Sequence, residues 1–232
     1  MSPDAASPTS PTSPPAEPAP PVDDIGRVAA AHARLDLVIA GLSDDDARSP
    51  SRLPGWSVGH LLTHVARNAD SQLRRIDAAI AGEVVDQYPA GAAGRAGEID
   101  AGAARPASEL VADVHLTSLA VDEAWPRVPA DAWSNLTRDL SGHERPLFEL
   151  PGRRWLEVEI HLIDLGRPGD PTQADWSDDF VDVWLPLQRA GLAPRLPDGA
   201  SAPPPGSVDP RNELAWIVGR LQPPDLPLLS SW

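Results

Sequence analysis

The sequence predicts a mainly α protein with three or four long helices followed by a small irregular module. Two observations predict this fold class. Apolar residues recur at helical spacing in separate segments of the first two thirds of the chain. Proline and glycine gather between those segments and again near the C-terminus, where they interrupt regular structure. We therefore expect a disordered tail over residues 1–22, a helical bundle over residues 23–167 and a small C-terminal module over residues 168–232.

The predicted N-terminal tail consists mostly of Pro, Ser, Ala and Thr, with eight prolines among the first 21 positions. Proline removes backbone hydrogen-bond donors, and such a segment has almost no apolar surface to bury. We expect an extended, solvated tail with polyproline II character.

Three long helices follow from capping residues and from apolar spacing. The first begins at Asp23 and Asp24, because paired aspartates suit a helix N-terminus. Ser57 is expected to cap the second helix, which should end near Gly82. Pro106 opens the third helix, which should run to about Trp125. Between the last two, residues 86–105 indicate a loop with at most a short helix.

The segment at residues 156–165 is compatible with two kinds of structure. Its alternation of polar and apolar residues fits a strand, whereas a second set of its apolar residues fits one face of a helix. Propensity alone slightly favours the strand. Glu157 and His161 share a face under either period. Farther on, short helices are expected over residues 179–190 and 212–220, separated by a Pro/Gly-rich stretch.

Composition narrows the possible functions. The net charge of −15 makes nucleic acid and anionic membranes poor partners. No apolar run approaches the roughly 20 residues that span a bilayer, and no leader pattern is present, so we expect a cytoplasmic protein. The chain has no cysteine, which excludes disulfides and thiolate metal ligands. Any sulfur chemistry therefore needs a small-molecule thiol.

The basic residues carry two further indications. All 19 of them are arginine, and Ala, Pro and Gly are abundant, as expected of a GC-rich, actinobacterial genome. The absence of lysine also excludes Schiff-base chemistry on a lysine side chain.

His64, Glu157 and His161 are the candidate metal ligands. Glu157 and His161 lie four residues apart, and His64 lies on the edge of the apolar face of its own helix. Three protein ligands leave a coordination position open, as in catalytic zinc sites. His64 could instead be a core-edge histidine that bonds a backbone carbonyl, or it could bind metal together with His60.

The acidic residues of the same segment have a second interpretation. Glu157 or Glu159 could form structural salt bridges with Arg153 or Arg154, since a buried carboxylate needs a compensating cation. The sequence leaves these alternatives open.

Four segments resemble the mycothiol-dependent maleylpyruvate isomerase family, within the DinB-like metalloenzymes. They are residues 51–70 (SRLPGWSVGHLLTHVARNAD), residues 157–165 (EVEIHLIDL), residues 88–99 around Arg95, and residues 214–220 (LAWIVGR). The resemblance covers roughly residues 24–232, and its first two segments are the more specific. The chain departs from the family pattern between Leu196 and Asp209, where it is short and the family usually has strands.

The resemblance implies a four-helix DinB-like bundle in which residues 156–165 are helical, followed by a shortened α+β module. It also implies a metal triad of His64, Glu157 and His161, and anion-binding catalytic arginines at Arg95 and Arg220. The expected cofactors are a divalent metal, most simply zinc, and mycothiol. Arg220 lies in the shortened module. The shortening therefore affects the placement of Arg220 and the isomerase activity that the resemblance implies.

The implied reaction is thiol-dependent isomerisation of maleylpyruvate to fumarylpyruvate, or addition of mycothiol to other electrophiles. A metal with an open position binds the thiol and lowers its pKa. The thiolate adds to the double bond, the resulting single bond rotates, and elimination restores the alkene. Two alternatives share the same three ligands: a metal-dependent hydrolase that uses a metal-bound water, and a non-catalytic DinB-like binding protein.

Overall fold

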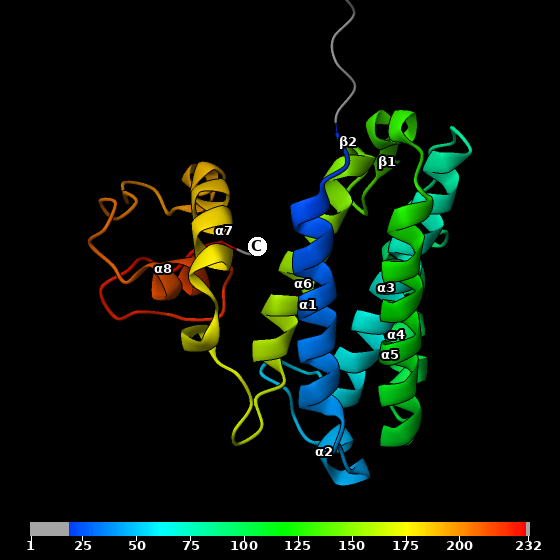
Figure 1. Cartoon of the computed structure of the whole chain (residues 1–232). Helices are drawn as coiled ribbons and strands as arrows, with labels where there is room; N and C mark the ends of the chain where they lie inside the picture. The colour runs from blue at the N-terminus through cyan, green and yellow to red at the C-terminus, as the bar shows by residue number, and fades with distance from the viewer. Residues whose placement is uncertain (1–18, 231–232) are drawn as a thin grey trace, which may run out of the picture.

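The computed structural model describes residues 19–230 and shows a helical bundle with a smaller module beside it (Figure 1). This described part contains eight α-helices, five short 3-10 helices and one two-stranded sheet. The predicted mainly α fold is therefore confirmed. The tail predicted over residues 1–22 falls mostly on residues 1–18, which lie outside the described residues.

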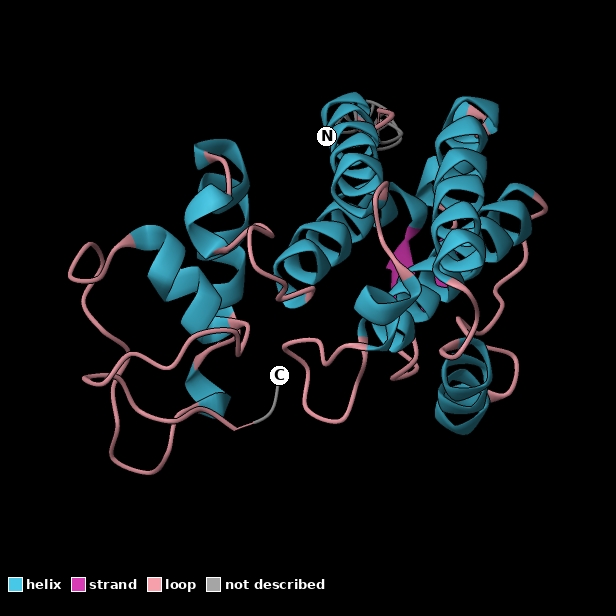
Figure 2. Cartoon of the chain, turned by 90° about the horizontal axis from the view of Figure 1, so that it is seen from below, coloured by secondary structure: helices cyan, strands magenta, loops and turns pink. Residues whose placement is uncertain are grey.

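Four long helices form the bundle: α1 (Val22–Ile39), α3 (Val58–Ile80), α5 (Ala107–Ala124) and α6 (Leu150–Asp164). Helix α3 packs against α5 and α6, and α1 packs against the same two helices. Figure 1 shows the four helices side by side, and Figure 2 shows the same arrangement nearly end-on. Their apolar faces meet in one core with fully buried members from every helix, among them Leu35, Leu62, Val114 and Ile160.

Helix α3 begins and ends as its sequence predicts. The Ser57 side chain accepts a hydrogen bond from the backbone N–H of His60, and His60 returns a contact to the cap backbone. Gly82 follows the helix with a positive φ of 75°. Near its start, a Cβ at Gly59 would collide with the carbonyl oxygen of Ala103. Glycine at this position therefore lets the end of α4 (Gly91–Gly102) lie against the start of α3.

Helix α6 contains the segment whose local pattern favoured a strand. That local preference is wrong, and the helix implied by the family resemblance is confirmed. The reason is burial on several faces: α6 packs on α1 and α3, and its outer side meets the C-terminal module. A helix buried nearly all round carries apolar residues on every side, which hides its 3.6-residue period. Pro151 in the first turn suits the start of this helix.

The short elements lie at the two ends of the bundle. Helix α2 (Asp44–Arg48) caps one end, and the hairpin of β1 (Leu136–Arg138) and β2 (Glu144–Pro146) lies at the other (Figure 1). The two strands are antiparallel, with Thr137 opposite Arg145.

The C-terminal module contains α7 (Asp178–Ala190) and α8 (Pro210–Ile217), as expected, joined by long loops. Among residues 19–230 the two-stranded sheet lies in the hairpin at residues 136–146, and the described part of the module holds helices and loops alone. The Pro/Gly-rich stretch at residues 191–209 lacks the backbone donors and apolar alternation that a sheet strand needs. Trp176 and Phe180 of this module belong to the same apolar core as the bundle.

Within residues 19–230, no helix has both the length and the apolar character needed to cross a membrane.

Candidate metal centre

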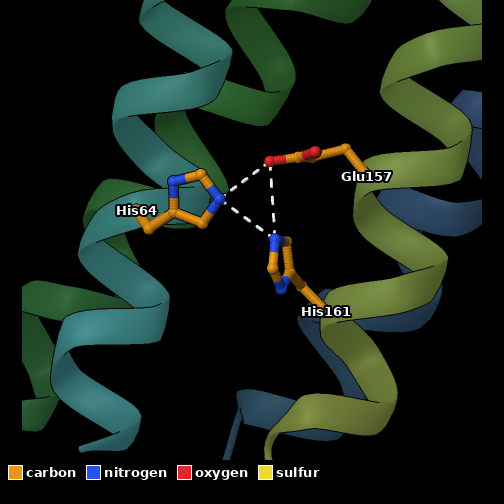
Figure 3. A group of neighbouring side chains, drawn as sticks. All are labelled: His64, Glu157 and His161. Carbon is orange, nitrogen blue, oxygen red and sulfur yellow. Dashed lines mark hydrogen bonds and ion pairs between the residues drawn. The ribbon is translucent and has the colours of Figure 1, made fainter. Parts of the chain in front are cut away.

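Three side chains from two bundle helices point to one place (Figure 3). His64 comes from α3, and Glu157 and His161 come from successive turns of α6. His64 Nε2 lies 2.8 Å from Glu157 Oε1 and 3.0 Å from His161 Nε2. His161 Nε2 lies 3.5 Å from the same carboxylate oxygen. The structure therefore brings together the three residues that the sequence analysis singled out as metal ligands.

Helix geometry explains why these residues meet. Residues four apart on a helix lie on one face, so Glu157 and His161 present their polar atoms together. The packing of α3 on α6 then carries His64 to the same point. His64 and His161 are buried, with 4% and 8% of their surfaces exposed, and Glu157 is half-buried. The cluster is thus enclosed in the bundle, with its most open side at Glu157.

Asp164 fixes the orientation of His161. Its Oδ2 lies 2.8 Å from His161 Nδ1, and the carboxylate is fully buried. An ionised carboxylate only accepts hydrogen bonds, so Nδ1 carries a proton and Nε2 is the ring nitrogen that faces the cluster. Arg220 holds the other side of Asp164, with Nη2 2.8 Å from Oδ2 and Nε 3.0 Å from Oδ1. The C-terminal module reaches the cluster through this chain.

A second polar chain orients Glu157. Asn68 donates from Nδ2 to Glu157 Oε1 at 3.1 Å, and its own Oδ1 accepts from Arg154 Nη1 at 2.9 Å. Arg154 is fully buried and also donates through Nε to Nε2 of His32 at 3.0 Å. Because a guanidinium N–H always donates, His32 must carry its proton on Nδ1, which faces Asp122 at 3.0 Å.

Arg95 covers one face of the His64 ring. Its Nη2 lies 3.0 Å from Nδ1 and 3.5 Å from Nε2 of His64. Because both ring nitrogens lie at similar distances, the guanidinium sits over the ring face and not in line with a nitrogen lone pair. Its Cζ also lies 5.8 Å from the centroid of the Tyr88 ring. The in-plane lone pair of His64 Nε2 thus stays directed at Glu157 and His161.

Burial and neighbouring charges set the protonation of the cluster. Burial lowers the pKa of His64 to about 4, with help from His161 and Arg95 and against the pull of Glu157. Burial alone would raise the pKa of Glu157, but hydrogen bonds with His161 and His64 hold it well below its usual value. Burial alone would lower the pKa of His161, but its bonds with Asp164 and Glu157 raise it. The cluster therefore attracts positive charge.

The donor set fits a divalent cation. Zinc binds imidazole nitrogen and carboxylate oxygen at about 2.0–2.2 Å, so tetrahedral ligand atoms lie roughly 3.3 Å apart. The three donor atoms lie 2.8, 3.0 and 3.5 Å apart, close to that spacing. Asp164 bonds His161, and Asn68 bonds Glu157. Metal-ligating side chains typically have such additional hydrogen-bond partners.

The structure also decides between the other interpretations. His60 turns back to cap its own helix through Ser57 and does not join the cluster. Glu159 pairs with Arg34 at 2.9 Å, so the alternative in which it pairs with Arg153 or Arg154 is wrong. Arg153 instead pairs with Glu149, which lies four positions earlier, just before the first residue of α6. The Glu159–Arg34 pair joins α6 to α1, a contact that local spacing does not reveal, whereas the Arg153–Glu149 pair has local i,i+4 spacing.

Sequence reasoning did not single out Asp164, and it considered Arg154 only as a possible salt-bridge partner of Glu157 or Glu159. Asp164 follows His161 by three residues, a spacing that signals a side-chain pair on a helix. Asn68 follows His64 by four residues on the same face, which is a similar signal. Arg154 carries no such signal, because its partners come from α1 and α3.

Fold and site together define a class: a DinB-like helical bundle that carries two histidines and a glutamate at one interior point. The family model described as "Mycothiol maleylpyruvate isomerase N-terminal domain" matches residues 28–166. The chain belongs to this family, which is a family of enzymes.

Solved structures agree with the fold. A crystal structure of the mycothiol-dependent maleylpyruvate isomerase superposes with a TM-score of 0.79 at 21% identity, covering 92% of this chain and 97% of that chain. A histidine-to-alanine mutant of that isomerase superposes with a TM-score of 0.76 at 20% identity and the same coverage. No curated protein matches the chain.

Proposed function

We propose that the protein is a divalent-metal-dependent and mycothiol-dependent enzyme of the maleylpyruvate isomerase type, acting as an isomerase or as a thiol transferase on electrophiles. The observation that carries this proposal is the convergence of His64, Glu157 and His161 inside a bundle that belongs to the isomerase family. The complete lack of cysteine supports a thiol that arrives as a small molecule. The net charge of −15 supports small molecules over nucleic acid as ligands.

The three residues would hold the cation, most simply zinc, and a bound cation would supply the positive charge that favours the thiolate form of a small thiol. His64 is ready for this role, because its lowered pKa leaves it neutral at pH 7. Asp164 holds the Nδ1 proton of His161 and so keeps Nε2 turned inward. Asn68 donates to Glu157 and limits its rotation. Burial of both imidazoles keeps bulk water away from the reacting atoms.

Two arginines border the site and would contribute positive charge to a carboxylate substrate. Arg95 lies on α4 over His64, where its guanidinium is close to any ligand of the cluster. Arg220 bonds Asp164 and also lines a cavity of about 480 Å³ in the C-terminal module. We propose that both act as anion-binding residues, since a guanidinium matches the geometry of a carboxylate.

The chain divides at about residue 167 into two parts that supply different residues to the site. The bundle over residues 23–167 supplies all three metal-binding side chains, and the module over residues 168–232 supplies Arg220. We propose that these are two functional domains joined by the Asp164–Arg220 pair.

The test begins with elemental analysis of protein purified without added metal. The proposal predicts about one equivalent of a divalent metal per chain. Conversion of maleylpyruvate to fumarylpyruvate is then followed with and without mycothiol, with a mycothiol-and-buffer blank as control. Thiol-independent consumption of the substrate that forms hydrolysis products and no fumarylpyruvate would favour a metal-dependent hydrolase. A bound metal with no thiol binding and no turnover would favour a non-catalytic protein.

A further inference from the structure

A cavity of about 310 Å³ opens beside the candidate metal centre and is not used by the mechanism above. It is lined on one side by Asn68, Gln72 and Arg75 of α3 and on another by Glu157 of α6. Asn68, Gln72 and Arg75 follow His64 along α3 at intervals of three or four residues. The four side chains therefore form one polar stripe on this helix. Glu157 belongs both to the cluster and to the lining, so the cavity borders the cluster.

Arg75 is the unusual member of this lining. Only 4% of its surface is exposed, and its one hydrogen bond runs from Nε to the backbone oxygen of Ser71. Among residues 19–230 no carboxylate lies within salt-bridge distance of it. A buried charge without a partner is costly, so an opposite charge at this position is strongly stabilised. The terminal nitrogens of Arg75 are left to bind something outside the described chain.

The neighbouring charges do not fill this gap. Asp139, at the rim, already accepts hydrogen bonds from Arg145 and from the backbone N–H groups of Ser141 and His143. Arg153, on the opposite wall, is neutralised by Glu149. Glu157 faces the two imidazoles. The cavity thus holds one cation, Arg75, that has no direct ion pair with a carboxylate of the described residues.

Gln72 provides a second, independent sign of a missing ligand. Its side chain is 3% exposed, and its Oε1 is buried with no hydrogen-bond partner in the described part of the chain. Buried polar atoms are nearly always satisfied, so an orphan acceptor in a cavity wall points to a bound polar group or water. Gln72 and Arg75 lie on the same wall, one turn apart.

We propose that this cavity is a carboxylate subsite in which Arg75 binds the carboxylate of a small organic acid. The proposal rests on the proposed function and deepens it, because it assigns the acidic end of the substrate to Arg75. Along the helix axis, Ser71 lies about 10 Å from His64 at 1.5 Å per residue, and Arg75 folds back toward that level. That separation suits a ligand whose carboxylate is a few bonds removed from the carbon that reacts at the cluster.

The experiment titrates fumarate into the protein by calorimetry, with dimethyl fumarate as the uncharged probe of the same carbon skeleton. Fumarate should bind, and Arg75→Gln should weaken it by about 10- to 100-fold, the usual range for a charge-assisted hydrogen bond. The ester should bind weakly and equally to both proteins. Arg127→Gln removes an exposed arginine that does not line the cavity and should leave fumarate binding unchanged.

Two further variants keep the result interpretable. Arg75→Lys retains the charge but loses the planar fork, so it should bind fumarate more weakly than the wild type even if Arg75→Gln does not fold. His64→Ala should still bind fumarate through Arg75, which separates this subsite from direct coordination to a metal. Equal affinity of the wild type and Arg75→Lys, or loss of fumarate binding in His64→Ala alone, would overturn the proposal.

The subsite and the proposed function can fail separately. Fumarate binding that depends on Arg75 in a protein without thiol-dependent turnover would retain the subsite and reject the function. Thiol-dependent turnover with the same KM for acidic substrates in Arg75→Gln and wild type would retain the function and reject the subsite.

Discussion

The bundle and the C-terminal module contribute to the site in different ways. The bundle supplies the three clustered donor atoms from the middle of two packed helices, α3 and α6. The module supplies Arg220, which follows α8 and reaches His161 only through Asp164. Side chains on packed helices are held more firmly than side chains on loops. The bundle therefore forms the cluster, and we expect the module to influence it through the Asp164 contact.

The largest expected effect comes from removing a donor of the bundle. His64→Ala should lose the bound metal and all thiol-dependent activity, because two remaining ligands hold a catalytic metal poorly. Elemental analysis and thiol-dependent turnover measure the two losses. His115→Ala, which removes an exposed histidine paired with Asp36, is the matched control and should keep both. Full metal content and turnover in His64→Ala would show that the three bundle side chains do not hold a catalytic metal.

The next effect tests the contact between the two regions. Asp164→Asn should lower metal affinity by about 10- to 100-fold, because the amide no longer holds the Nδ1 proton of His161. Competition with a chromophoric chelator measures the affinity. Glu159→Gln changes another buried carboxylate of α6 that pairs with Arg34 instead of the cluster, and it should leave the affinity unchanged. Equal losses in both variants would mean that buried charge on α6, and not the His161 contact, determines affinity.

The same difference between regions explains what the sequence could predict. The helices of the bundle follow from Ser57, Gly82 and Pro106, whose capping and stopping roles are local. The pairing of Glu157 with His161 also follows from local spacing. The meeting of His64 with them depends on how α3 packs on α6, which local spacing does not encode.

The other parts of the site depend on contacts between distant segments. Arg154 reaches His32 across 122 positions, and Arg220 reaches Asp164 across 56. Neither contact leaves a periodic pattern in the sequence. The helical state of residues 156–165 was also hidden locally, because burial on several sides places apolar residues at positions that a surface helix would leave polar.

A smaller effect is expected from the module itself. Arg220→Gln should lower metal affinity by about two- to tenfold, since it removes hydrogen bonds to Asp164 but leaves the Asp164–His161 contact in place. Turnover on a carboxylate substrate should fall further than metal affinity, because Arg220 is also proposed to bind anions. Chelator competition and steady-state kinetics separate the two effects.

The matched control for this variant is Arg211→Gln on α8, which pairs with the exposed Asp178. It should change neither quantity. A loss of metal in Arg220→Gln as large as that in Asp164→Asn would show that the module helps to form the cluster, and the distinction between the two regions would then disappear.

The smallest effect concerns the pH dependence of bundle stability. Burial lowers the pKa of His32, so the folded protein keeps this ring neutral while the unfolded chain protonates it near pH 6.5. Its contribution to stability is therefore present above pH 6.5 and is lost as the pH falls below it, by at most about 1.4 kcal/mol per pH unit. Neutral His32 accepts from Arg154, and a protonated ring could not do so.

Urea unfolding from pH 7.5 to 5.5 should show a shallower decline of the unfolding free energy in His32→Gln than in wild type. His64, whose pKa is about 4, adds a similar decline to both proteins and cancels in the comparison. Identical slopes would mean that the contact between His32 and Arg154 does not depend on a neutral ring. A shallower slope would show that the folded protein holds His32 neutral, as its acceptance of a hydrogen bond from Arg154 requires.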